Sequence, residues 1–183
     1  ANKLNIKNLI LLSKDKNTSF SRLTPETINF FEKKPGYDTL RLLLCKKAIL
    51  VEGDADALIV QKAYLNKNGI LPIENDIDVI SVGNTFLRFL EISTLLEKET
   101  IVVTDNDGDI EQLKNKYENY LGKNEKNFIK ICYDDETHIE QGNLRSKNGG
   151  TFNYDTLEPC MLRANNLDTL NEILETNKST DDE

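Results

Sequence analysis

The chain has 183 residues, of which 38% are hydrophobic and 30% are charged, enough for one globular domain with a sizeable core. No apolar run approaches the roughly 20 residues that span a bilayer, and we find no signal-peptide pattern, so we expect no membrane partner. The net charge of −8 argues against nucleic-acid binding through a basic surface alone, but not against an enzyme that meets phosphates through bound metal.

The N-terminal part, residues 1–37, holds one apolar run, "NLILL". Thr24 followed by Pro25 predicts the start of a helix in "TPETINFFE". After the turn "PGYD", Asp38 is expected to cap a helix over "TLRLLLCKK". This part either completes a sheet or belongs to a neighbouring domain. Because the first residue is Ala1 and not Met, we expect the chain to be a piece of a longer protein.

Strand and helix signals alternate through the middle of the chain. The expected strands are 48–51, 77–83, 100–104 and 128–133, and the expected helices are 54–68, 84–98 and 110–121. Gly69 and Gly122 supply left-handed stops after the first and last of these helices. Strict alternation implies right-handed crossovers and a parallel sheet. We predict an α/β fold with a Rossmann-like parallel sheet of about four strands flanked by helices, and small N- and C-terminal additions.

The C-terminal part begins with a polar loop over 134–150, followed by one or two short helices in "YDTLEPCMLRANNLDTLNEIL". His138, the only histidine, lies in this loop and is expected to be exposed and uninvolved. The chain ends in an acidic, solvated "STDDE". Three widely separated cysteines without a CxxC pair predict reduced thiols and a cytoplasmic location.

Acidic residues follow two of the expected strands. Glu52 follows the first, and Asp105 and Asp107 follow the third in "VTDNDGD". The carboxyl ends of parallel strands share one edge, so we expect these carboxylates to converge there. Two like charges about 4 Å apart repel by roughly 4 kcal/mol at an effective dielectric of about 20, so one is protonated or a cation lies between them. Oxygen-only ligands favour Mg²⁺, Mn²⁺ or Ca²⁺ over zinc.

A structural role is the alternative for each acid, because aspartates after strands often cap helices or make turns. We expect Asp109 and Asp54 to be such caps. Glutamate is a poor cap, so Glu52 is harder to explain in this way. An EF-hand loop starting at Asp105 is excluded, because its sixth position is Ile110 instead of glycine and its twelfth is lysine instead of glutamate.

Other enzyme and signalling classes fit less well. A haloacid-dehalogenase phosphatase would use Asp105 as its nucleophile, but its motif ends the first strand of the core, not the third. A receiver domain also has an acid after its third strand, but Glu52-Gly53-Asp54 is a poor match to its acidic pair. We expect Gly53, Gly83 and Gly108 to allow tight turns beside the acidic edge.

The segments "AILVEGDADALIV" and "IVVTDNDGD" resemble the Toprim domain, in which one strand ends in Glu-Gly and a later one in Asp-x-Asp. "DTLRLLLCKKAILVEGDADALIVQKAYL", "SVGNTFLRFLEI" and "NYDTLEPCMLRAN" are most similar to the overcoming-lysogenization-defect (OLD) nucleases, over roughly residues 35–175. The resemblance implies a metal-dependent DNA endonuclease or nickase. It also implies a function in defence against phage. Toprim primases and topoisomerases are the alternatives, but the additional domains of those enzymes are missing from this sequence.

The resemblance also implies roles for single residues. Glu52, Asp105 and Asp107 would be catalytic and bind Mg²⁺ or Mn²⁺, with Ca²⁺ as a non-catalytic substitute. Asp56 in "EGDAD" and Glu158 in "TLEP" would be further metal ligands. A basic residue should balance charge on the phosphate, and the candidates for this DNA contact are Arg145, Lys147 and Arg163.

The domain boundaries expected from the resemblance are a connecting segment over 1–37, a Toprim nuclease domain over 38–175 and a flexible acidic tail over 176–183. In the OLD family an ATPase domain precedes the Toprim domain. This sequence has no GxxxxGK[ST] loop, so ATP would act only through that absent domain. Besides DNA and the ATPase domain, the resemblance admits a homo-oligomer and a helicase-like partner.

Overall fold

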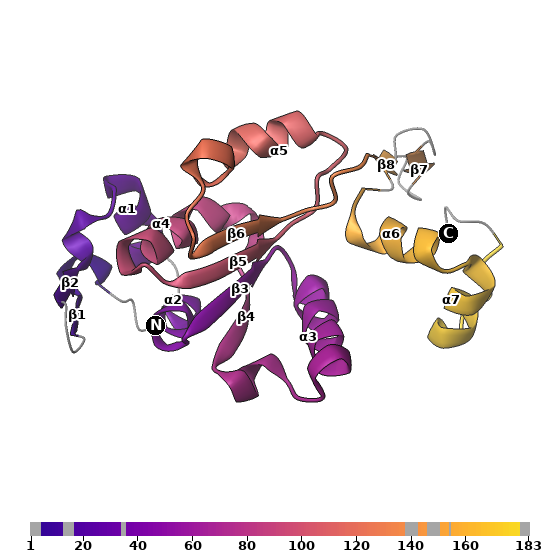
Figure 1. Ribbon diagram of the computed structural model, residues 1–183. Coiled ribbons are helices and arrows are strands. Elements are labelled where there is room, and N and C mark those ends of the chain that lie inside the picture. Colours follow the sequence, from indigo (N-terminus) through magenta and orange to yellow (C-terminus); the bar gives the residue numbers. More distant parts are fainter. Residues whose placement is uncertain are drawn as a thin grey trace. The chain divides into compact units, whose positions relative to one another are not determined.

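The computed structural model describes residues 5–12, 17–33, 36–137, 143–145, 151–153 and 155–179 (Figure 1). Its contacts divide the chain into two compact units. The first comprises Ala1–Thr104 and Tyr117–Cys132, and the second comprises Asp105–Lys116 and Tyr133–Glu183. Within the described ranges, no helix is both long and apolar enough to cross a membrane.

The first unit is built on a four-stranded sheet in the order β4-β3-β5-β6, and all three strand pairs are parallel. The strands are β3 (Lys47–Val51), β4 (Ile77–Ser81), β5 (Glu99–Val103) and β6 (Ile129–Cys132). β3 is central, and its last four residues are buried, as expected for a strand covered on both faces. The predicted α/β fold with a four-stranded parallel sheet is confirmed.

Three helices of this unit flank the sheet: α2 (Tyr37–Leu44), α3 (Asp54–Asn68) and α4 (Phe86–Leu96). Figure 1 shows α3 and α4 on opposite sides of the sheet. Because side chains alternate along a strand, Ile49 and Val51 pack with Ala57 and Val60 of α3, while Leu50 belongs to the other face. α4 contacts β5 and β6 and contributes a buried apolar stripe to the core.

In its described residues, the N-terminal segment adds no strand to this sheet. β1 (Ile10–Leu12) and β2 (Asn17–Ser19) form an antiparallel pair of their own, and α1 (Pro25–Lys33) packs against α4. Phe31 and Phe89 meet edge to face at 5.1 Å. The Glu91 carboxylate of α4 accepts hydrogen bonds from Thr24 and Thr27. This segment is therefore joined to the sheet unit through α4.

The second unit has its own elements. They are α5 (Ile110–Lys116), the antiparallel pair β7 (Asn143–Arg145) and β8 (Thr151–Asn153), α6 (Leu157–Ala164) and α7 (Leu167–Leu174). The two short helices agree with the sequence prediction, whereas β7 lies in the loop predicted over 134–150. Six short 3₁₀ helices complete the described structure: Ile6–Asn8, Phe20–Arg22, Pro72–Asn75, Gly83–Thr85, Glu118–Tyr120 and Gly122–Asn124.

Several helix ends follow the prediction. Pro25 is the first residue of α1, and the Thr24 hydroxyl accepts a hydrogen bond from the Thr27 N–H at 3.4 Å. Gly69 ends α3 in the left-handed conformation, with φ = 77°. The predicted cap at Asp38 is wrong, because α2 begins at Tyr37 and places Asp38 inside its first turn.

The predicted helix over 110–121 is too long. α5 ends at Lys116, and the backbone of Tyr117 leaves the helix with φ = −107° and ψ = 21°. The Tyr117 ring is fully buried, and its centroid lies 6.3 Å from that of Phe86. Packing of this large ring in the core thus overrides the helical periodicity.

Arg41 joins α2 to β4, which is the edge strand of the sheet. Its guanidinium donates to both Asp78 carboxylate oxygens, at 3.0 and 2.6 Å, and to the Val79 carbonyl at 2.7 Å. The side chains of Arg41 and Asp78 are only 28% and 16% exposed. A bidentate, half-buried ion pair of this kind fixes the orientation of α2 more firmly than a surface pair would.

We expect Arg41→Ala to lower the free energy of unfolding by about 1–3 kcal/mol, because it leaves the Asp78 carboxylate and Val79 carbonyl without their donor. Urea denaturation measures the change. The matched control is Lys46→Ala, because the Lys46–Asp76 pair is 2.7 Å long but 81% and 60% exposed and should contribute little. Equal effects of the two substitutions would contradict this ranking.

Candidate functional site

The two acidic motifs follow neighbouring parallel strands. β3 pairs with β5 in the register Leu50↔Val102. Glu52 is the first residue after β3, and Asp105 is the second after β5. Because the two strands run in the same direction, the chain leaves both at the carboxyl edge of the sheet, where parallel α/β folds bind ligands.

Hydrogen bonds to its backbone carbonyl fix Glu52 at this edge. Its carbonyl accepts hydrogen bonds from the Gly83 N–H at 2.9 Å and from the Ser81 hydroxyl at 3.1 Å. Gly83 has φ = 58°, a conformation that glycine adopts without strain, so the tight turn predicted there is confirmed. The end of β4 therefore fixes the position from which the half-buried Glu52 side chain projects.

Tyr117 is a neighbour of Glu52 that the sequence did not single out. Burial raises the pKa of the Tyr117 phenol, and the negative charge of Glu52 raises it further, against the opposing effect of a hydrogen bond with Thr104. The phenol therefore stays neutral beside the Glu52 carboxylate. A buried, neutral phenol is unsuited to the role of a topoisomerase nucleophile.

Gly53 and Asp56 form the start of α3. The Gly53 N–H donates to Asp56 Oδ2 at 2.8 Å, the reciprocal half of a capping box. The predicted cap role of Asp54 is wrong, because Gly53 is the N-cap and Asp54 is already helical. Gly53 is extended, with φ = −120°, so it makes no glycine-only turn; instead, a Cβ there would lie 3.2 Å from Asp56 Oδ2.

In the second unit, the loop "DNDGD" assigns different tasks to its residues. Asp105 is half-buried, Asn106 is 3% exposed, and Asp107 is exposed. Asp107 and Gly108 are both left-handed, with φ = 52° and 77°, and the Asp109 N–H donates to the Asn106 carbonyl at 2.9 Å. These features define a type I′ turn, which confirms the tight turn predicted at Gly108.

Asp109 begins α5, as predicted. Its Oδ1 accepts a hydrogen bond from the Gln112 N–H at 2.9 Å, and its carbonyl accepts one from the Leu113 N–H at 3.0 Å. This is the bonding pattern of an N-cap residue. Asp109 therefore has a structural function as the N-cap of α5.

Helix α6 of the same unit carries groups that interact with Asp105. Burial raises the pKa of the Cys160 thiol; Arg163 opposes this effect, while the negative charges of Asp105, Asp134 and Asp155 add to it. Arg163 Nη2 lies 3.7 Å from Asp134 Oδ2. Asp105 thus belongs to a group of charges in which an arginine on α6 partly balances several carboxylates.

The structure places the predicted site residues in both units. Glu52 and Asp56 belong to the first, and Asp105, Asp107, Glu158 and Arg163 belong to the second. Glu158 is exposed in the first turn of α6. Arg145 lies in β7, and its side chain is not described; Lys147 and His138 lie outside the described residues. Within the described part of the chain, no three His, Cys, Asp or Glu side chains form a ready metal-binding group.

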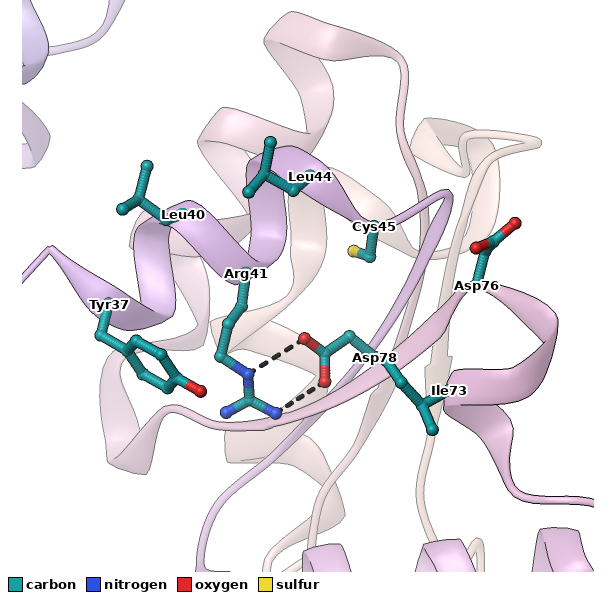
Figure 2. A pocket seen from close by; sticks show the side chains of 8 residues that line it. All are labelled: Tyr37, Leu40, Arg41, Leu44, Cys45, Ile73, Asp76 and Asp78. Atoms are coloured by element: carbon teal, nitrogen blue, oxygen red, sulfur yellow. Dashed lines mark hydrogen bonds and ion pairs between the residues drawn. The ribbon is translucent and has the colours of Figure 1, made fainter.

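A surface pocket of about 410 Å³ lies elsewhere, beside α2 and β4 (Figure 2). Its apolar lining includes Tyr37, Leu40, Leu44 and Ile73, with the Arg41–Asp78 ion pair at its side. It lies near the residues that enter β3 and β4, not at the carboxyl ends of the strands. It contains none of the predicted site residues.

Comparison with known proteins supports the assignment of the sheet unit. Residues 43–107 match the family model described as "Overcoming lysogenization defect protein-like, TOPRIM domain". The matched segment begins at the end of α2, contains β3, α3, β4, α4 and β5, and ends at Asp107, so it includes both acidic motifs. No curated protein and no solved structure matches the chain.

The capping bond of Asp56 makes a prediction about stability. We expect Asp56→Ala to lower the free energy of unfolding by about 1 kcal/mol, because the Gly53 N–H loses its acceptor. Asp56→Asn keeps an oxygen acceptor and should retain most of this stability. Thermal or urea unfolding of the two variants measures the difference, and an Asn variant as unstable as the Ala variant would show that the bond is not what Asp56 contributes.

Proposed function

We propose that this chain, whose residues 43–107 match the OLD-like Toprim family model, is the catalytic part of a divalent-metal-dependent DNA endonuclease or nickase. The family match indicates a nuclease-type domain that uses metal and acts on nucleic acid. The observation that carries the finer proposal is that the Glu-Gly and Asp-x-Asp motifs follow two adjacent parallel strands, β3 and β5.

The residues at these strand ends fit a hard divalent cation. Glu52, Asp105 and Asp107 offer only oxygen ligands, the set that Mg²⁺ and Mn²⁺ prefer. Asp107 is exposed on a left-handed turn, and Asp105 is half-buried. We propose Mg²⁺ or Mn²⁺ as the working cofactor and Ca²⁺ as a substitute that binds without supporting cleavage.

Each acid then has a role. Asp105 and Asp107 would hold metal, and Glu52 would either hold metal or accept a proton from the attacking water. A pair of bound divalent ions supplies an activated nucleophile and stabilises the leaving oxygen in phosphodiester hydrolysis. The neutral Tyr117 phenol beside Glu52 adds no second negative charge and therefore does not compete with Glu52 for either role.

Asp56 and Glu158 are proposed as additional metal ligands. Asp56 lies one helical turn beyond Glu52. Its Oδ2 accepts a hydrogen bond from the Gly53 N–H, so Oδ1 would be the oxygen that binds metal. Glu158 is exposed on α6, the helix whose Cys160 interacts with Asp105. Both assignments rest on the similarity of "EGDAD" and "TLEP" to family motifs.

A basic side chain should bind the phosphate, and Arg163 has the best support. It is on α6, ion-paired with Asp134, in the same group of charges as Asp105. Arg145 and Lys147 are the other candidates from sequence. An arginine suits this role because its planar fork of donors can bind two phosphate oxygens at once.

The proposal extends to the intact protein. The Toprim domain would cover 38–175, after a connecting segment over 1–37 and before an acidic tail over 176–183. A preceding ATPase domain would couple ATP to cleavage of DNA in the cytoplasm. The protein would form a homo-oligomer and act with a helicase-like partner. Its biological function would be defence against phage. These features rest on family resemblance.

Cleavage of a supercoiled plasmid by the full-length protein in Mg²⁺ or Mn²⁺ tests the function. We expect Glu52→Ala and Asp105→Ala each to reduce the rate at least about 100-fold, because each removes a group that stabilises the transition state. Asp109→Asn is the matched control from the same loop: it keeps the cap on α5 and should leave the rate nearly unchanged.

Nicked and linear products report single- and double-strand cleavage separately, and EDTA should abolish both. Wild-type rates in the Glu52 and Asp105 variants would overturn the assignment of the site. A loss of rate in Asp109→Asn as large as in Asp105→Ala would show that the loop tolerates no substitution, and the roles of single acids would then have to be abandoned.

A further inference from the structure

The middle residue of the Asp-x-Asp motif is more deeply buried than either acid. Asn106 is 3% exposed, between half-buried Asp105 and exposed Asp107. Burying an amide costs free energy unless its polar atoms are hydrogen-bonded. A buried asparagine between two candidate metal ligands therefore requires a structural explanation.

The hydrogen bonds of Asn106 supply it. Its Nδ2 donates to the Asp134 carbonyl at 2.9 Å and to the Glu136 carbonyl at 2.8 Å, and its Oδ1 accepts from the Gly108 N–H at 2.8 Å. Both N–H groups and the carbonyl oxygen of the amide are thus used. The partners also fix the orientation of the amide, because two carbonyls require a donor and an N–H requires an acceptor.

These bonds fix the motif to two parts of the backbone. The bonds to residues 134 and 136 join it to a chain segment 28 and 30 positions away, within the same unit. The bond to Gly108 closes the turn in which Asp107 has φ = 52°. Left-handed backbone is unfavourable for a residue with a Cβ, and the Asn106 side chain offsets that cost.

The network continues to helix α6. Asp134 Oδ1 accepts from the Glu136 N–H at 3.1 Å, and its Oδ2 lies 3.7 Å from Arg163 Nη2. The segment whose backbone Asn106 bonds is thus also the segment that Arg163 contacts, through the Asp134 side chain. Substitution of side chains that hydrogen-bond around metal ligands commonly weakens metal binding by roughly 10–100-fold.

We propose that Asn106 is a positioning residue for metal binding: its amide, bonded to the backbone at residues 108, 134 and 136, sets the backbone from which Asp105 and Asp107 present their carboxylates. The inference rests on the proposed function, since it assumes that these two acids hold the metal. It assigns Asn106 no contact with metal or DNA.

Two substitutions test the proposal, with Mn²⁺ titrated into metal-free full-length protein and followed by electron paramagnetic resonance. Asn106→Ala removes all three bonds. Asn106→Asp keeps the shape and the acceptor for Gly108 but loses both donated bonds, and it adds a negative charge beside the metal site. Charge alone would make Asn106→Asp bind Mn²⁺ more tightly, whereas positioning predicts roughly 10–100-fold weaker binding for both variants.

Asn171→Ala is the matched control. Asn171 lies in the same unit and also has three amide hydrogen bonds: its Nδ2 donates to the Lys178 carbonyl, and its Oδ1 accepts from the Lys178 N–H and the Thr176 hydroxyl. Its loss should lower the free energy of unfolding without changing Mn²⁺ affinity. Urea titrations check that each variant is folded under the assay conditions. If Asn106→Ala is unfolded, the Mn²⁺ affinity of Asn106→Asp tests the proposal.

The outcomes separate the two proposals. If the wild type binds no Mn²⁺, both the metal site and the role of Asn106 are overturned. If the wild type binds Mn²⁺ and Asp105→Ala does not, but both Asn106 variants bind like the wild type or more tightly, the positioning role alone is overturned. Weaker binding in both Asn106 variants, with Asn171→Ala unchanged, supports it.

Discussion

The parallel pairing of β3 with β5 is the constraint on which the candidate site depends. Both strands are apolar, both are covered by helices, and their register, Leu50↔Val102, follows from burying alternate side chains on each face. A slip of one residue would reverse the faces of the whole strand, so the register is strongly specified. The same pairing ends β3 directly before Glu52 and ends β5 two residues before Asp105.

The loop "DNDGD" that follows β5 distributes its polar residues among different tasks. Asp109 caps α5, and Asn106 bonds the backbone of residues 108, 134 and 136. Those two tasks are structural and need no ligand. Asp105 and Asp107 are the acids that we propose hold metal, and the family match covers both. The loop thus combines a rigid support with the groups that would bind the cation.

Much of this fold could be predicted from sequence because its signals are local. Apolar runs, helix periodicity and glycine stops located the four strands and α3, and the residue type and position of Asp109 identified it as a cap. The interactions that were missed join distant parts of the chain. Arg41 and Asp78 are 37 positions apart, and Asn106 reaches the carbonyl of residue 136 across 30. Periodicity within one element carries no information about such contacts.

Tyr117 shows the same limit in a different form. It lies within the helix predicted over 110–121. Its ring packs in the core, beside Phe86 and close to Glu52, and α5 ends at Lys116, directly before it, instead of at residue 121. Whether an apolar residue extends a helix or terminates it depends on where its partner lies, and that partner is 31 positions away.

The central claim is that Glu52 and Asp105 bind the same metal centre. The most direct measurement is anomalous diffraction at the manganese edge from crystals of the protein soaked in Mn²⁺. The account predicts manganese with carboxylate oxygens of Glu52 and Asp105 among its ligands, at roughly 2.0–2.3 Å. Manganese bound only by other acids, such as Asp134 and Asp155, with Glu52 and Asp105 remote from it, would contradict the account.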